Sequence, residues 1–377
     1  MKVVHIGPGG VSARGGMGRL LAYLTEALRM SGQAIEVRVL DSYGPGPFAL
    51  MPFYFFALCF RLPFAAARAD VVHIHTAAFG SALRKLALVR LCKMMGRPTV
   101  LHIHGAEFAD YYGALRPPLR RLIEGGLKAA DRVIVLGSYW QRFFVETVGL
   151  SAEKVVVVHN GVPFLPLPER TEDEGPCLLL ALGELGARKG TPETIAALGQ
   201  LAGSHPNWRA VLAGNGAVEE FRAQVASSPL AGRVELPGWV DKAEARDLLA
   251  RAHVLLLPSH NEGLPVAILE AMAAGLAVIA TPVGAIEDAV VNGETGLIVP
   301  PGDSNALARA IARLLDDPDL RHRMGEAGRQ RFVERFTIAE AARRVINIYR
   351  DLLQLGPLPD PGLEPGRALE HADTGLS

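Results

Sequence analysis

The stretch HNEGLPVAILEAMAAGLAVIATPVGAIEDAV runs from His260 to Val290 and decides the fold. Its centre is an apolar run with helical character, which one carboxylate, Glu270, interrupts. A second carboxylate, Glu262, stands just before that run. Because burying an unpaired charge costs several kcal/mol, each acid should have a polar partner. The stretch therefore indicates a polar ligand or a polar side chain near this helix.

The residues around the two acids predict a loop followed by a helix. Pro265 suits the first helical turn, and Gly275 suits the residue after the last one. The free amides at a helix start attract an anion such as a phosphate, and Gly263 lets it approach the backbone. Glu262 is expected to accept hydrogen bonds from hydroxyls beside the phosphate, and Glu270 suits a ribose diol. A sugar–diphosphate–nucleoside offers its groups in this order.

Strand-like runs alternate with helix-like runs on both sides of this stretch. The first set of strands is predicted at residues 3–6, 35–40, 70–75, 98–104, 132–137 and 154–161, and the second at 177–183, 209–214, 233–238, 253–259, 276–281 and 295–300. Helices are predicted at residues 18–32, 80–96, 118–130, 138–149, 192–201, 217–228, 243–252, 305–317 and 339–355. Because the strands are nearly continuous apolar runs, we expect parallel sheets with helices on both faces. The fold class is α/β, with two doubly wound Rossmann-like domains that face a cleft.

A segment rich in proline and charge, Val162–Pro176, is predicted to link the two domains. We expect the first domain to span residues 1–165 and the second 166–335. Residues 336–355 should form a C-terminal helix that packs back toward the first domain. Residues 356–377 have the proline and glycine content of a disordered tail.

The composition excludes some classes of protein. The 377 residues contain 39 basic and 39 acidic side chains, so a nucleic-acid-binding protein is not expected. Three widely spaced cysteines, Cys59, Cys92 and Cys177, form neither a metal-binding pattern nor a disulfide framework. No secretory signal is expected, because the chain begins directly with a strand pattern. These features predict a protein of the reducing cytoplasm.

The stretch from Phe48 to Ala67 is apolar and aromatic, but Pro52, Arg61 and Pro63 interrupt it. A transmembrane helix, which needs about 20 apolar residues, is therefore not expected. Two alternatives remain open. The stretch can lie in a membrane interface with its aromatic rings immersed and Arg61 at the headgroups, or it can be an ordinary helix packed on a sheet.

The opening stretch closely resembles the E-x7-E region of the retaining glycosyltransferases of family 4, which have the GT-B fold. The resemblance extends over roughly residues 1–350. In that family the first glutamate contacts the donor sugar and the second contacts the ribose. The resemblance therefore implies these roles for Glu262 and Glu270, and it implies that the backbone amides of Gly263 and Leu264 bind the donor.

Two further motifs of the first domain resemble motifs of this family. The sequence GGMGRLLAYLTEAL resembles the family's glycine loop, which implies that Gly16 lies near the donor phosphate and the acceptor. The sequence HIHG at 102–105 resembles the family's strand-end histidine motif. That motif implies that His104 lies beside the transferred sugar, with His102 as the alternative.

Other motifs of the second domain also resemble the family. The sequence ALGELGARKG implies that Lys189 binds the diphosphate, whose departing charge must be stabilised. Glu184 stands where the family usually has arginine, and Arg188 is the alternative cation, so the resemblance leaves their roles open. The sequence LAGNG, which contains Gly214, resembles a loop near the nucleobase.

The resemblance implies transfer of a hexose from a nucleoside-diphosphate sugar, either GDP-mannose or a UDP-hexose, with retention of configuration. No bound metal and no other cofactor is expected; the sequence DDPD at 316–319 reads as a solvated turn, and GPGGVS at 7–12 lacks a complete dinucleotide fingerprint. The expected acceptor is a glycan, with a polyprenyl-linked glycan of a bacterial surface polysaccharide as the specific hypothesis. We also expect peripheral contact with the inner face of the cytoplasmic membrane. The basic residues that suit such an anionic surface are Arg61, Arg84, Lys85, Arg116, Arg120 and Arg121.

Two other functions remain open at this stage. A sugar-nucleotide 2-epimerase with the GT-B fold would use the same donor without an acceptor. A non-catalytic two-domain sugar-binding protein would bind the ligand without releasing nucleoside diphosphate.

Overall fold

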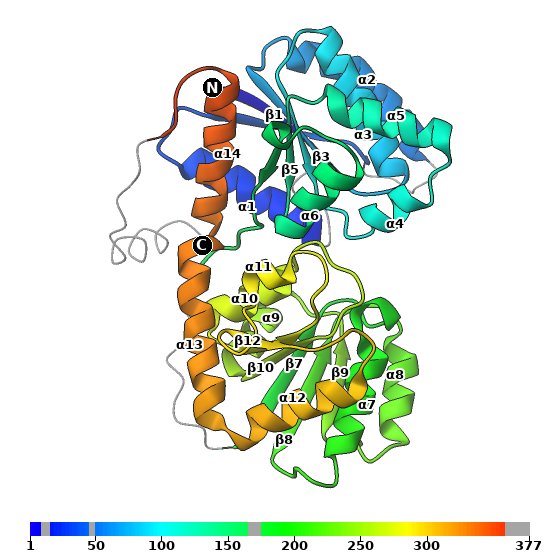
Figure 1. Cartoon of the computed structure of the whole chain (residues 1–377), viewed down its shortest axis with the longest axis vertical. Coiled ribbons are helices and arrows are strands. Elements are labelled where there is room, and N and C mark those ends of the chain that lie inside the picture. The colour runs from blue at the N-terminus through cyan, green and yellow to red at the C-terminus, as the bar shows by residue number, and fades with distance from the viewer. Residues whose placement is uncertain (9–15, 45–49, 165–174, 359–377) are drawn as a thin grey trace. The chain divides into compact units, whose positions relative to one another are not determined.

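The computed structural model describes residues 1–8, 16–44, 50–164 and 175–358. The chain divides into two compact units, which Figure 1 displays. Unit 1 consists of Met1–Phe164 and Phe336–Ser377, and unit 2 consists of Leu165–Arg335. The predicted linker and tail lie largely outside the described residues.

Unit 1 is built on a six-stranded parallel sheet with the strand order β2-β1-β3-β4-β5-β6. Its strands are β1 (Lys2–Gly7), β2 (Glu36–Asp41), β3 (Val71–Thr76), β4 (Thr99–Ile103), β5 (Arg132–Val135) and β6 (Val155–Val157). Every residue of β3 and of β4 is buried, as expected for central strands with helices on both faces. From β1 the chain moves outward to β2 and then continues with β3 on the other side of β1, so the strand order reverses between β1 and β3. Such sheets form ligand crevices at this point.

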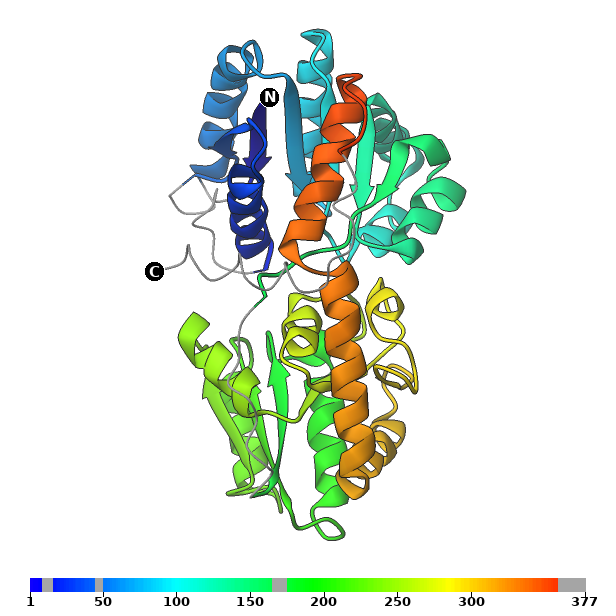
Figure 2. The same cartoon turned by 90° about the vertical axis from the view of Figure 1, so that its left-hand side faces the viewer.

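The helices of unit 1 lie on both faces of its sheet (Figure 1). They are α1 (Gly16–Met30), α2 (Met51–Ala66), α3 (Gly80–Met94), α4 (Phe108–Gly113), α5 (Pro117–Ala129), α6 (Ser138–Arg142), the π-helix Phe143–Thr147, the 3-10 helix Ala152–Lys154 and α14 (Ile338–Leu352). Figure 2 shows α14 beside α1 on one face of the sheet, and the two helices are in contact. Val345, Ile346 and Tyr349 of α14 are buried in the same core as Val3 of β1.

Unit 2 repeats this architecture with the strand order β12-β11-β10-β7-β8-β9, again fully parallel. The strands are β7 (Cys177–Leu182), β8 (Trp208–Ala213), β9 (Val234–Gly238), β10 (Val254–Leu257), β11 (Ala277–Ala280) and β12 (Gly296–Ile298). The helices are the 3-10 helix Ala187–Lys189, α7 (Thr191–Leu201), α8 (Val218–Ala226), α9 (Lys242–Arg251), α10 (Val266–Ala273), α11 (Ile286–Ala289), α12 (Ser304–Asp316) and α13 (Pro318–Arg335). The predicted α/β class with two doubly wound sheets is confirmed.

Helix α13 is the longest element and has no counterpart among the predicted helices. Its polar sequence contains Gly325 and Gly328 and shows little amphipathic periodicity, so the pattern did not indicate a helix. Gly325 lets the helix approach the carbonyl of Gly275, where a Cβ atom would overlap. The Asp317 carboxylate accepts a hydrogen bond from the amide of Leu320 at 2.8 Å, so DDPD includes the start of α13.

Helix α2 corresponds to most of the apolar stretch that the sequence left with two interpretations. Pro52 lies in its first turn and Pro63 near its end, and neither breaks it. Among the described residues, no helix is both long enough and apolar enough to cross a membrane. Leu58 and Leu62 are buried, but four phenylalanines of α2 are between 67% and 73% exposed, namely Phe53, Phe56, Phe60 and Phe64. The helix therefore packs on the unit through one side and presents aromatic rings on another.

Candidate active site

Loops at the carboxyl ends of the unit 2 strands bring together several residues that the sequence singled out. The loop after β7 carries Arg188 and Lys189, and the loop after β10 carries Glu262. The backbone amide of His260 donates a hydrogen bond to the carbonyl of Arg188 at 2.8 Å. This bond joins the two loops and fixes their side chains relative to one another.

Lys189 and Glu262 form an ion pair at the centre of these loops. The Lys189 ammonium donates to Oε1 of Glu262 at 2.5 Å, and the Ser259 hydroxyl donates to the same oxygen at 2.8 Å. The Glu262 side chain is only 6% exposed and that of Lys189 is 18% exposed. Glu262 therefore has polar partners from the protein itself, whereas the partners expected from the sequence were hydroxyls of a ligand.

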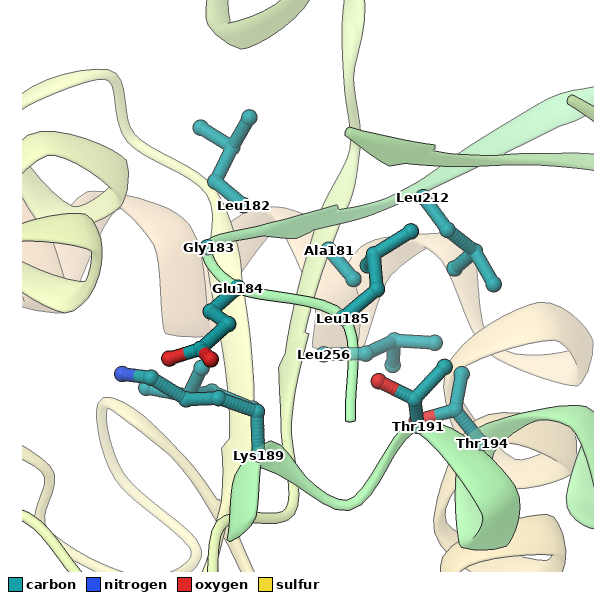
Figure 3. A pocket seen from close by; sticks show the side chains of 11 residues that line it. Ala181, Leu182, Gly183, Glu184, Leu185, Lys189, Thr191, Thr194, Leu212 and Leu256 are labelled. Atoms are coloured by element: carbon teal, nitrogen blue, oxygen red, sulfur yellow. The ribbon is translucent and has the colours of Figure 1, made fainter. Parts of the chain in front are cut away.

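Arg188 and Glu184 form a second, more exposed pair on the same loop. The Arg188 guanidinium donates to Oε2 of Glu184 at 3.3 Å and to the carbonyl of Asn261 at 3.4 Å. Figure 3 shows the side chains of Glu184 and Lys189 side by side, at the edge of a pocket that Thr191 also lines. The carboxylate that replaces the expected arginine thus lies within a cluster of two cations.

Two glycines allow the loops of unit 2 to pack backbone against backbone. Gly214 has a φ of +156°, and a Cβ atom there would overlap with the carbonyl of Gly183. A Cβ atom at Gly284 would likewise overlap with the carbonyl of Glu262. Any larger residue at these positions would displace the loops that carry the ion pair.

The second acid lies on α10, which begins one residue after Pro265. Pro265 takes the N-cap position, with a φ of −68° and a ψ of 128°, rather than a position in the first turn. Gly263 and Leu264, just before it, are buried, and Glu270 is half-buried within the helix. Gly275 has a φ of +68° and follows the helix, as predicted. The expected order of loop, helix start and acid is therefore present.

Unit 1 contains the other two predicted site residues. Gly16 is the exposed first residue of α1, and the glycine loop before it lies outside the described residues. His104 follows β4 and is half-buried. His102 and His104 are stacked, with ring centroids 4.0 Å apart. The two candidates for the strand-end histidine are therefore in contact, and the sequence could not decide which of them fills that role.

Three more histidines, none of them among the predicted site residues, lie near this pair. His5 of β1 is in register with His73 of β3, and His75 of β3 is in register with His102 of β4. Alternate residues of a strand point to one face of the sheet, so all of these rings gather on one face. The repeated H-x-H pattern at 73–75 and 102–104 was the signal that could have revealed the cluster.

Burial lowers the pKa of every imidazole in this cluster. The pKa of His5 falls to about 3 and that of His104 to about 4, while those of His73, His75 and His102 lie well below the ordinary value. Desolvation of the charged form is the main cause, and the neighbouring imidazoles add repulsion for the last three. The rings are therefore neutral at physiological pH.

Neutral imidazoles are also metal ligands. Two triads have ring nitrogens within 4.8 Å of one another, one formed by His5, His73 and His75 and the other by His75, His102 and His104. Among the described residues, these are the groups that could hold a metal ion.

Comparisons with known proteins match both units. The family model described as glycosyltransferase family 4 matches residues 14–164, and the model described as glycosyl transferases group 1 matches residues 167–331. The two matches thus meet near the boundary between the two units.

Curated relatives match most of the chain. A glycogen synthase of Mycobacterium tuberculosis is 30% identical over 312 residues, covering 81% of this chain and 73% of that protein. A phosphatidyl-myo-inositol mannosyltransferase of Mycolicibacterium smegmatis is 28% identical over 298 residues, covering 76% of this chain and 72% of that protein. Among solved structures, a sucrose-phosphate synthase of Thermosynechococcus elongatus superposes with a TM-score of 0.79 at 22% identity, covering 94% of this chain and 99% of that one.

Proposed function

Because the chain belongs to the group 1 glycosyltransferases of family 4 and has their GT-B fold, we propose that it moves a hexose from a nucleoside-diphosphate sugar, with retention of configuration, to a hydroxyl of a lipid-linked glycan. That the chain is a glycosyltransferase follows from its family. The donor, the acceptor and the stereochemistry are the proposal. GDP-mannose and UDP-hexoses are the candidate donors.

The proposed donor site rests on one observation, the buried ion pair between Lys189 and Glu262. Glu262 lies just before α10 in the sequence. A diphosphate beside the start of α10 would attract the Lys189 ammonium, and the amides of the helix start would add to this attraction. Glu262 would then accept hydrogen bonds from sugar hydroxyls, and Glu270 from the ribose. The ion pair thus holds both side chains ready and keeps the acid satisfied before the donor arrives.

Binding geometry and charge then account for the chemistry. The leaving diphosphate carries growing negative charge, which Lys189, with Arg188 beside it, would stabilise. The acceptor hydroxyl would attack from the face that the diphosphate leaves and would lose its proton as the new bond forms. We propose that no metal is required, since the two cations and the helix amides supply the positive charge that a metal would otherwise provide.

A donor-binding experiment tests this proposal. A thermal-shift screen of UDP-, GDP- and ADP-sugars identifies the base, and release of nucleoside diphosphate measures turnover. Glu270→Gln should weaken donor binding, whereas Glu262→Gln should lower turnover by about 100-fold or more. Glu287→Gln is the control, because Glu287 is an exposed acid on α11. Wild-type rates in both site variants would refute the assignment.

The same experiment separates the two alternatives. Incubation with the donor alone would yield an epimerised sugar nucleotide if the chain were an epimerase. A sugar-binding protein would show a thermal shift without release of nucleoside diphosphate. Either result would replace the proposed transfer reaction.

We further propose that unit 1 binds its acceptor at the inner face of the cytoplasmic membrane through α2. The exposed phenylalanines of α2 recur three or four residues apart and thus form one face of the helix. An apolar face of this kind inserts into the interface, and Arg61, exposed on the same helix, suits anionic headgroups. Lys85 is buried, so its predicted part in a basic membrane surface was wrong.

Sedimentation with vesicles tests the membrane contact. Wild-type protein should sediment with phosphatidylglycerol vesicles, and replacing Phe56 and Phe60 together with serine should abolish this. Trp239→Ser is the matched control, because Trp239 is a large ring of unit 2 that is 67% exposed. Equal sedimentation of both variants, or none of the wild type, would rule out α2 as the contact.

A further inference from the structure

Five histidines and one tyrosine of unit 1 are joined end to end by hydrogen bonds. We call this set the histidine chain. Its five links join His102 Nδ1 to His73 Nε2 (3.3 Å), His73 Nδ1 to Tyr349 Oη (2.6 Å), Tyr349 Oη to His5 Nε2 (3.1 Å), His5 Nδ1 to His75 Nε2 (3.0 Å), and His75 Nδ1 to His104 Nε2 (2.9 Å). Each ring between the two ends uses both of its nitrogens.

The two ends of the histidine chain meet at one cavity. Nε2 of His102 and Nδ1 of His104 are buried, and neither has a hydrogen-bond partner among the described residues. Both rings line a cavity together with Asn160 and Gly161, and the rings stack on each other. The free nitrogens therefore lie on neighbouring rings of the same cavity.

Counting protons restricts what these two ends can do. Each neutral imidazole has one N–H donor and one acceptor nitrogen, and the tyrosine has one hydroxyl proton. The histidine chain therefore holds one proton more than its five links can use. The extra proton therefore resides either at one of the two ends, which makes one end a donor and the other an acceptor, or on the tyrosine hydroxyl.

Two arrangements satisfy every link and leave no buried hydroxyl proton without an acceptor. In the first, all five histidines carry their proton on Nδ1, so His104 donates into the cavity and His102 accepts. In the second, all five carry it on Nε2, and the roles of the two ends are reversed. A third arrangement, in which Tyr349 accepts from both neighbours, leaves its fully buried hydroxyl proton without an acceptor, which is costly.

We propose that the histidine chain makes this cavity a binding site for one neutral hydroxyl group, and that it moves one proton between the two ends. A hydroxyl accepts from one end and donates to the other, whereas an anion needs two donors and a cation two acceptors. The group belongs either to a water or to the sugar acceptor, and the second case rests on the proposed transfer reaction.

The proton step is balanced without a charged imidazole. The O–H bond of the bound hydroxyl breaks as its oxygen bonds to the anomeric carbon of the donor sugar, and the proton passes to Nδ1 of His104. The bond between that carbon and the diphosphate breaks in the same reaction, and the diphosphate leaves with the electron pair. In each of the five hydrogen bonds the shared proton then moves from its donor atom to the atom that had accepted it. The proton on Nε2 of His102 leaves to a water molecule. The second arrangement thereby becomes the first, and every ring remains neutral, as burial demands.

Nitrogen-15 NMR of the histidine side chains tests the inference, because its shifts distinguish the two tautomers and the charged form. In the wild-type protein at pH 7 we expect the five residues to be neutral and to share one tautomer, or one ratio of tautomers. Mixed tautomers within the set, or a charged ring, would overturn the proposal.

The variant Tyr349→Phe cuts the histidine chain in the middle. A buried acceptor without a partner costs less free energy than a buried donor without one. In each half of the cut chain, the nitrogen that faced the tyrosine hydroxyl should therefore carry no proton. We expect His5, His75 and His104 to become Nδ1–H tautomers, and His73 and His102 to become Nε2–H tautomers. Tyr111→Phe is the control, since its buried hydroxyl has no partner among the described residues. Unchanged tautomers in Tyr349→Phe would contradict the coupling.

Two additions separate the possible occupants. Methyl α-D-glucopyranoside as a probe should shift the His102 and His104 signals if a sugar hydroxyl enters the cavity, and it should leave them unchanged if a water stays there. Stoichiometric binding of Zn²⁺ that His102→Ala abolishes would instead make the free nitrogens metal ligands and overturn the proposal. None of these readouts requires turnover, so their failure is distinct from failure of the transfer reaction.

Discussion

At the scale of single residues, unit 1 buries polar groups that a stable core usually avoids. Lys85 on α3 is 2% exposed, and burial lowers its pKa to about 7. The nearby Arg84 lowers the pKa further, and Asp41 opposes this shift. The histidine chain solves the same problem by staying neutral and hydrogen-bonded, whereas in unit 2 Glu262 is satisfied by an ion pair. The sequence could predict that such groups need partners, but it could not identify them.

The lysine gives a prediction about stability and pH. Because the unfolded Lys85 binds its proton below about pH 10.5 and the folded one only below about 7, folding expels a proton in this window. Stability contributed by this residue therefore rises with pH, by about 1.4 kcal/mol for each unit between pH 7 and 10. The variant Lys85→Met should therefore be more stable than the wild type, with the largest difference in the free energy of unfolding near pH 7. This difference should shrink toward pH 10.

Urea unfolding of the variant and the wild type at several pH values measures this difference. Lys128→Met is the control, because Lys128 is exposed on α5. It should leave the pH dependence of the wild type unchanged. A Lys85→Met advantage that stays constant from pH 7 to 10 would show that this lysine is not neutral in the folded state.

At the scale of elements, the sequence predicted those segments whose apolar pattern is strong and missed those that depend on tertiary contacts. The twelve strands of the two sheets were predicted within a few residues, because central parallel strands are continuous apolar runs. Helix α13 was missed, since its glycines and polar residues do not indicate a helix by themselves. Its glycines are explained by the close packing of α13 on the end of α10. Helix α6 continues as a π-helix at Phe143–Thr147, which periodicity alone cannot reveal.

Helix α13 gives a prediction about glycine. Gly→Ala in a helix usually stabilises by up to about 1 kcal/mol. At Gly325 the added methyl would overlap with the carbonyl of Gly275, so Gly325→Ala should instead destabilise by about 1–3 kcal/mol. The matched variant is Gly199→Ala on α7, where nothing lies within 4 Å of the added atom. Urea unfolding compares the two, and a Gly325→Ala protein as stable as Gly199→Ala would exclude the close contact.

At the scale of the whole molecule, each unit contains some of the residues that the sequence singled out, and unit 1 is itself built from two parts of the chain. The E-x7-E region indicated the family, since its loop, helix start and acids occur in a fixed order, and the alternation of strand-like and helix-like runs predicted the fold. The pairing of Glu262 with Lys189 joins residues more than seventy positions apart, and the histidine chain joins β1, β3, β4 and α14. Such long-range contacts depend on sheet order, which one sequence does not specify.

The discontinuous unit gives the last prediction. Ile346 of α14 is buried in the core of unit 1, so Ile346→Ala should destabilise that unit by about 2–5 kcal/mol. Hydrogen exchange should therefore quicken in β1 and β3, although α14 follows the whole of unit 2 in the chain. The matched variant, Ile311→Ala, removes a buried isoleucine of α12 and should quicken exchange in β10 and β11 instead. If Ile346→Ala affected the strands of unit 2 and spared β1 and β3, α14 would not belong to the core of unit 1.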